Sequence, residues 1–145
     1  MSESRPRFHL AIAVDDLSAA EAFYAGVLQC RIGRASEKWI DFDLMGHQVT
    51  AHRCDTTREE ARNPVDGESI AVPHFGLILE WEQLEALTER LRTCGVAFDL
   101  EPTVRFRGEV GEQATAFVRD PAGNMLEFKA FRNPDQVFAR QAGSE

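Results

Sequence analysis

Two histidines and one glutamate have the types and places that a metal centre requires. His9 and His74 each stand near the start of a short apolar run, and Glu127 stands among the apolar residues of a third run. A carboxylate in such surroundings is costly to bury unless a positive charge compensates it. Two imidazoles and one carboxylate are typical ligands of non-haem Fe2+, and Mn2+, Ni2+, Co2+ and Zn2+ also accept them. We therefore expect His9, His74 and Glu127 to bind a divalent metal ion.

Each of these residues has a simpler explanation when it is taken alone. A histidine at a strand start is more often structural, and a glutamate in a strand more often faces solvent. The equivalent places of His9 and His74 in two similar halves of the chain favour the metal site.

The two halves repeat one order of elements, βαβββ. Apolar periodicity predicts strands in the first half at residues 8–14, 31–35 (a weak signal), 39–44 and 48–53. A helix is expected at 18–28, beginning with a capping box of Ser18 and Glu21. In the second half, strands are expected at 72–79, 96–100, 113–118 and 125–131, with a helix marked by Leu84, Leu87 and Leu91 and ended by Gly95.

This order predicts an α+β fold in which two βαβββ modules form a half-open barrel. The expected single domain covers residues 7–132, with modules at 7–53 and 72–132. The polar stretch 54–71 is expected to connect them, with a helical turn near 57–61, and 133–145 to form a C-terminal tail.

Composition narrows the possible partners and location. The 145 residues carry a net charge of −8 without any basic run, which argues against nucleic acids and anionic membranes. No apolar stretch reaches membrane-spanning length, and the N-terminus is too short and polar for a signal peptide. Three cysteines without metal-type spacing indicate reduced thiols, so we expect a cytoplasmic protein.

The motifs around these residues resemble the vicinal oxygen chelate superfamily, which includes glyoxalase I, extradiol dioxygenases, methylmalonyl-CoA epimerase, and fosfomycin- and bleomycin-resistance proteins. The resemblance spans about residues 7–132. It rests on the paired βαβββ units, Phe8-His9-Leu10, Pro73-His74-Phe75, and Arg119-Asp120-Pro121-Ala122-Gly123-Asn124 followed by Leu126-Glu127. The residues Trp39-Ile40-Asp41-Phe42-Asp43, Gly46-His47-Gln48 and His52 look closest to small extradiol-dioxygenase-like proteins.

The resemblance implies a metal-dependent enzyme that acts on a small molecule with vicinal oxygens, with dioxygenase chemistry first and Fe2+ or Mn2+ favoured. Glyoxalase- or epimerase-type isomerase or lyase chemistry is one alternative. A resistance-type protein that sequesters a small molecule is another. Proteins of this length in the superfamily commonly form homodimers, sometimes with each site shared between chains.

One departure from the superfamily pattern concerns the first module. Members with four protein ligands place Glu, Gln or His on its last strand, whereas aligning Gly46 with Gly123 puts Thr50 opposite Glu127. Threonine is a poor ligand for these metals. Either three protein ligands and water hold the ion, or a strand shift brings in Gln48 or His52.

Three further residues are candidates for contact with the substrate. His52 is an acid/base candidate or, equally, a structural histidine. Gln48 is expected to bind the substrate. Arg105 begins a charged loop at 105–111 and would grip a substrate carboxylate, or it belongs to a solvated hairpin. His47 is expected at the surface in a turn.

Overall fold

The computed structural model describes residues 5–55 and 60–140. They belong to two compact units. The first comprises Met1–Arg58 and Asp120–Asn124, and the second comprises Glu59–Arg119 and Met125–Glu145. Within the described ranges, no helix is long and apolar enough to cross a membrane.

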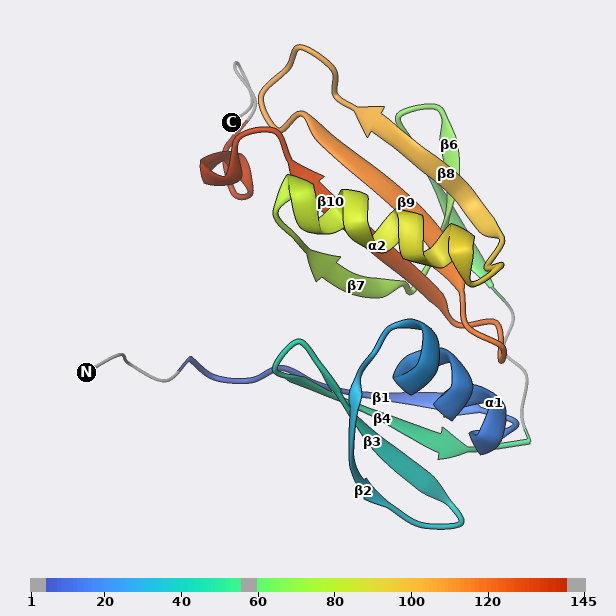
Figure 1. The fold of residues 1–145 in the computed structure, drawn as a ribbon. Coiled ribbons are helices and arrows are strands. Elements are labelled where there is room, and N and C mark those ends of the chain that lie inside the picture. The colour runs from blue at the N-terminus through green and yellow to red at the C-terminus, as the bar shows by residue number, and fades with distance from the viewer. Residues whose placement is uncertain (1–4, 56–59, 141–145) are drawn as a thin grey trace. The chain divides into compact units, whose positions relative to one another are not determined.

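The first unit is an open four-stranded sheet with one helical segment packed on it (Figure 1). The strands lie in the order β1-β4-β3-β2, and β1 runs parallel to β4. Side chains alternate between a face that packs on the helical segment and a face that carries polar groups. The elements are β1 (His9–Val14), α1 (Leu17–Glu21), the π-helical η1 (Ala22–Val27), β2 (Arg31–Ala35), β3 (Trp39–Leu44) and β4 (His47–Arg53).

Two local predictions in the first unit are wrong. Asp16, not Ser18, caps the helix, because its carboxylate accepts a hydrogen bond from the backbone of Ala19. His47 lies in β4 rather than in a turn, since Met45 and Gly46 alone close the hairpin with positive φ. The Nδ1 of His47 accepts a hydrogen bond from the backbone N–H of Phe8, at 3.0 Å.

The second unit contains a sheet with the same topology. Its strand order is β7-β10-β9-β8, with β7 parallel to β10, and α2 packs on one face (Figure 1). The predicted repeat and the α+β class are confirmed, whereas the half-open barrel stays a prediction. The elements are β7 (Phe75–Ile78), α2 (Trp81–Thr93), β8 (Phe98–Arg105), β9 (Gln113–Arg119) and β10 (Met125–Phe131), followed by the 3-10 turn η2 (Pro134–Gln136).

A hairpin breaks the symmetry between the two units. It consists of β5 (Ala61–Val65) and β6 (Glu68–Val72), in the stretch expected to be a plain connection. Ile70 and Ala71 of β6 pack against Phe117 and Met125 of the second sheet. Most of the predicted helical turn at 57–61 lies outside the described residues, but Ala61 begins a strand.

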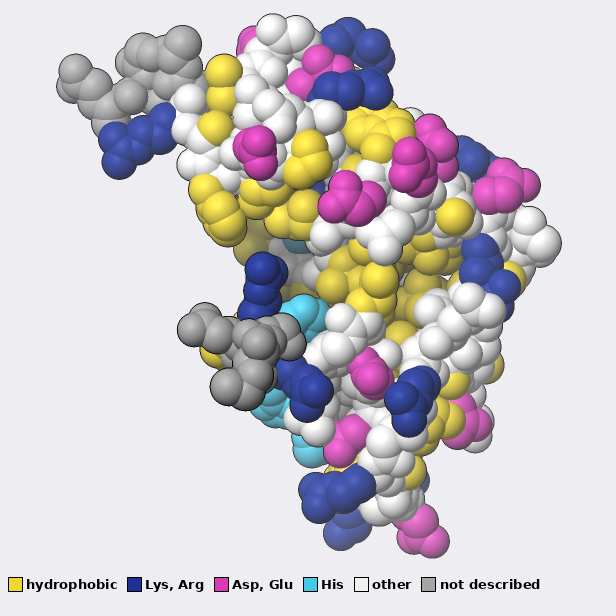
Figure 2. Space-filling model, turned by 60° about the vertical axis from the view of Figure 1, so that its left-hand side comes forward, with side chains coloured by type: hydrophobic (Ala, Val, Ile, Leu, Met, Phe, Trp, Pro, Cys, Tyr) yellow, Lys and Arg dark blue, Asp and Glu magenta, His cyan; other side chains and the backbone are white. Residues whose placement is uncertain are grey.

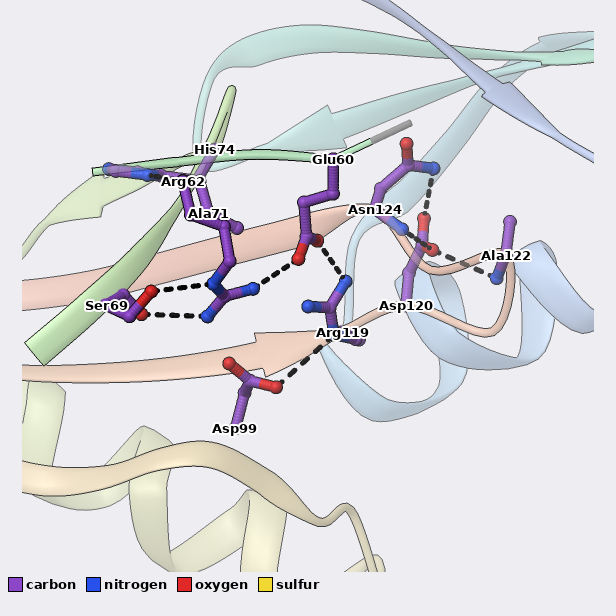
Figure 3. Close-up of polar contacts among 10 residues, drawn as sticks. All are labelled: Glu60, Arg62, Ser69, Ala71, His74, Asp99, Arg119, Asp120, Ala122 and Asn124. Carbon is purple, nitrogen blue, oxygen red and sulfur yellow. Dashed lines mark hydrogen bonds and ion pairs between the residues drawn. The ribbon is translucent and has the colours of Figure 1, made fainter. Parts of the chain in front are cut away.

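Charged side chains fasten this hairpin to the second sheet (Figure 3). The Arg119 guanidinium donates to Glu60 at 2.7 Å and to Asp99 at 3.3 Å. Arg62 donates to Glu60 and to the hydroxyl of Ser69. The hydrogen bond from Arg119 holds the pKa of the Glu60 carboxyl below its usual value.

The turn between β9 and β10 belongs to the first unit, where a buried carboxylate anchors it. Asp120 accepts hydrogen bonds from the Tyr24 hydroxyl at 2.7 Å and from the backbone of Ala122 and Asn124. The Asn124 amide donates to the carbonyl of Ala13 at 2.9 Å. Burial and the adjacent Asp120 charge raise the pKa of Tyr24 far above its usual value.

Tyr24→Phe should lower the free energy of unfolding at neutral pH by about 1–2 kcal/mol, because Asp120 stays buried without this donor. The folded protein holds the phenol proton more tightly than the unfolded chain, whose pKa is near 10.0. Wild-type stability should therefore fall as pH rises above 10, and less steeply in Tyr24→Phe. Denaturant unfolding from pH 7 to 11 measures both effects.

The thiol of Cys30, whose pKa burial raises to about 11, is present in both proteins, so its contribution cancels. Identical stabilities of the two proteins across this range would contradict the assignment of the Tyr24–Asp120 contact.

Candidate functional site

The ring of His74 is held between the hairpin and the second sheet. Its Nδ1 lies 2.7 Å from the carbonyl oxygen of Ala71 (Figure 3). Its ring packs edge-on against Phe117, with centroids 5.1 Å apart. A carbonyl oxygen only accepts hydrogen bonds, so the proton of a neutral His74 belongs on Nδ1. This contact leaves Nε2 as the nitrogen that is available to a metal.

Glu127 faces this nitrogen from β10. Its Oε1 lies 3.3 Å from the Nε2 of His74, and its Oε2 accepts a hydrogen bond from the Thr115 hydroxyl at 2.5 Å. The ammonium of Lys129 lies 3.8 Å from the same Oε1. The structure therefore brings together two of the three predicted metal ligands, and each has a hydrogen-bonding group behind it.

In the tautomer with the proton on Nδ1, the His74–Glu127 contact is favourable only with a positive charge between or beside its two atoms. With the proton on Nδ1, a lone pair on Nε2 faces a carboxylate oxygen, and two acceptors repel at this distance. A second proton on the ring or a metal cation removes the repulsion. A histidine N–H that donates to a backbone carbonyl, and a hydroxyl that donates to the carboxylate, are the usual supports of metal ligands. These residues fit a divalent cation.

His9 begins β1 in the first unit, where it pairs with Gln48 of β4. Both residues line a pocket of about 600 Å³, together with Arg31, Arg34 and Asp41. Histidine side chains lie beside Lys and Arg side chains on the face seen in Figure 2. Within either unit, the described residues include no group of three His, Cys, Asp or Glu side chains that could hold a metal. The joining of His9 to His74 and Glu127 stays a prediction.

Strand register confirms the predicted correspondence of Thr50 and Glu127. Ala11 pairs with Thr50 in the first sheet, as Gly76 pairs with Glu127 in the second. The buried Thr50 hydroxyl donates to Asp41 at 2.6 Å. No strand shift brings Gln48 or His52 into the place of Thr50, because the register of β1 with β4 is continuous from His9 to Val14.

The remaining candidates lie in different surroundings. His52 is exposed on β4, opposite Trp39 and Ala13. Arg105 was predicted to begin a loop, and this prediction is wrong. It is the last residue of β8, and only 4% of it is exposed. Its guanidinium donates to the carbonyl of Val65 at 3.1 Å, and its buried Nε has no partner among the described residues. Substrate binding by Arg105 stays a prediction.

Sequence reasoning missed Thr115, Ala71 and Asp41. Thr115 is two residues from Phe117 on β9, and strand alternation on β9 with pairing to β10 would have placed it on the face of Glu127. Asp41 is a carboxylate at a buried position in an alternating strand, which signals a polar partner. Ala71 contributes only its carbonyl, so its side chain carries no signal.

Comparison with known proteins places this geometry in context. The family model of the Glyoxalase/Bleomycin resistance protein/Dioxygenase superfamily matches residues 8–128. The crystal structure of a glyoxalase/bleomycin resistance protein/dioxygenase from Alicyclobacillus acidocaldarius is 30% identical, with a TM-score of 0.80 over 95% of this chain and 100% of that chain.

Two more distant structures share the fold. A fosfomycin resistance protein, FosX, from Listeria monocytogenes has 20% identity and a TM-score of 0.70 over 97% of this chain and 100% of that one. A lactoylglutathione lyase from Agrobacterium tumefaciens has 22% identity and a TM-score of 0.64 over 89% and 96% of the two chains.

Gly76→Ala should destabilise the protein by about 3 kcal/mol, because the added Cβ would lie 1.6 Å from the carbonyl oxygen of Glu127. Relief of this clash requires β7 to separate from the strand that carries Glu127. Gly26→Ala is the control, since its Cβ meets nothing within 4 Å, and its effect should stay below about 1 kcal/mol. Urea unfolding compares the two variants, and equal midpoints would refute the close packing of β7 on β10.

Proposed function

Because the chain belongs to the Glyoxalase/Bleomycin resistance protein/Dioxygenase superfamily, we propose that it is a divalent-metal-dependent enzyme acting on a small substrate with two neighbouring oxygen atoms. The observation that carries this proposal is the approach of His74 Nε2 to Glu127 Oε1. Both groups are oriented by hydrogen bonds, and their contact calls for a positive charge.

His9, His74 and Glu127 hold the ion in this proposal, with Fe2+ or Mn2+ favoured over Ni2+, Co2+ and Zn2+. When bound, the ion supplies a Lewis acid that polarises substrate oxygens. Gln48 is suited to substrate binding, because it lines the pocket beside His9. His52 is the proposed acid/base group. Thr50 is engaged by Asp41, which supports a three-ligand site with positions open to the substrate.

The proposed reaction is of the extradiol dioxygenase type. A catechol and O2 combine, one ring carbon–carbon bond breaks, and both oxygen atoms enter the product. Two histidines and one carboxylate are the donor set that non-haem Fe2+ oxygenases use. We place the protein in the cytoplasm as a homodimer, on its composition and its resemblance to superfamily members.

Metal analysis of tag-free protein should find about one divalent ion per chain in wild type. His74→Ala and Glu127→Ala should lose it, because each removes a ligand from an open site. Thr115→Val should weaken metal affinity by about 10–100-fold, since it removes the hydrogen bond that orients Glu127. Glu101→Ala, an exposed carboxylate of β8, should bind metal like wild type. A wild type that takes up none of the five ions would refute the proposal and leave a binding protein.

Oxygen uptake tests the reaction itself. Protein loaded anaerobically with Fe2+ should consume about one O2 per catechol cleaved, and Glu127→Ala should show no uptake above free Fe2+. An electrode follows the oxygen and absorbance follows the ring-opened product. Metal binding without uptake for any catechol would make the dioxygenase assignment wrong while the metal site stands.

A further inference from the structure

Lys129 lies beside the two residues at the centre of the second unit. It follows Glu127 by two positions on β10, so both side chains leave the same face of the sheet. Its Nζ is 3.8 Å from Glu127 Oε1, the oxygen that His74 Nε2 also approaches, at 3.3 Å. The ammonium therefore places a positive charge next to this contact, where a metal ion would place one within it.

The surroundings of Lys129 hold its ammonium close to Glu127. Its Nζ lies over the ring of Phe131, 5.8 Å from the ring centroid, and a cation at this distance is attracted to an aromatic face. In the described part of the chain, Glu127 is the only carboxylate with which Lys129 forms an ion pair. The lysine side chain is 29% exposed, so small molecules in the solvent have access to it.

Charge balance gives this ammonium two partners in turn. Without an ion, Lys129 and Glu127 neutralise each other. A divalent ion held by His74 and Glu127 brings more positive charge than the carboxylate compensates, and the ion and the ammonium then repel each other. An anion bound to the ion relieves this repulsion, because it lies next to both positive charges.

We propose that Lys129 couples the two ligands of this centre: it weakens binding of the metal ion alone, and it strengthens binding of an anionic ligand, such as an ionised substrate oxygen, to the loaded centre. The inference rests on the proposed metal-dependent function. It uses residues of the second unit alone. Coupling between two ligands is a free energy, so the effects of Lys129 on the ion and on the anion must have opposite signs.

Lys129→Met tests the first half of the proposal, because it removes the charge and keeps a side chain of similar length. Lys38→Met is the matched control. These are the only two lysines of the chain, and Lys38 is exposed in the bend before β3. In calorimetric titrations with Co2+, Lys129→Met should bind the ion about tenfold more tightly than wild type, since the repulsion is gone. Lys38→Met should bind it like wild type.

Anion binding to the Co2+-loaded proteins tests the second half, and visible absorption follows it. Azide, an anion, should bind about tenfold more weakly to Lys129→Met than to wild type. Imidazole, a neutral ligand, should bind to both within about twofold. Lys129→Arg keeps a positive charge and should resemble wild type in all three titrations.

A measurement on wild type needs no variant. When lysine carries a carbon-13 label, only Lys38 and Lys129 give side-chain signals in NMR spectra. Zn2+ should shift the Cε signal of Lys129 and leave that of Lys38 in place, because only Lys129 lies beside the centre. This result decides the matter if Lys129→Met does not fold.

The outcomes separate this proposal from the one on which it rests. Wild type that binds none of the divalent ions overturns both. Bound metal with equal Co2+ and azide affinities in wild type and Lys129→Met, or with an unmoved Lys129 signal, overturns the role of Lys129 alone. Weaker binding of both Co2+ and azide by Lys129→Met also overturns it, because that pattern indicates a residue that only maintains structure.

Discussion

The hydrogen bond between His74 and the carbonyl of Ala71 is the contact on which the candidate centre depends. It assigns the proton of the neutral ring to Nδ1, and it thereby aims a lone pair at Glu127. Ala71 belongs to the β5–β6 hairpin, so an element outside the repeat determines the chemistry of a residue inside it. The hairpin in turn depends on apolar packing against Phe117 and on the ion pairs of Arg119.

Much of the fold could be predicted from the sequence because each element of the module occurs in both halves, so a clear pattern in one half identifies its counterpart in the other. The weak strand at Arg31–Ala35 was recoverable because its module needs a strand there, although every residue in it is exposed. The β5–β6 hairpin had no such support. It has no counterpart in the first module, and Pro64 is unusual inside a strand unless the strand lies at a sheet edge, as β5 does.

Site residues could be predicted where one side chain must compensate the charge of another. They could not be predicted where backbone contacts or packing determine the position of the side chain. Glu127 between apolar residues called for a cation, and His74 lies against it. Arg105 was misplaced because charge and nearby glycines indicate a loop, whereas its long side chain is buried and donates to Val65. Asp41 was passed over, although its partner Thr50 is only nine residues away and lies opposite it across the β3–β4 hairpin.

The turn Asp120–Asn124 makes the first unit depend on a segment from the second repeat. It lies in the second repeat along the chain, yet its carboxylate meets the phenol of Tyr24 and its amide meets the backbone of β1. A fragment ending at residue 58 would keep the Tyr24 hydroxyl but lose its acceptor. The present chain is therefore a poor candidate for division into two independently expressed halves, although its sequence contains two similar modules.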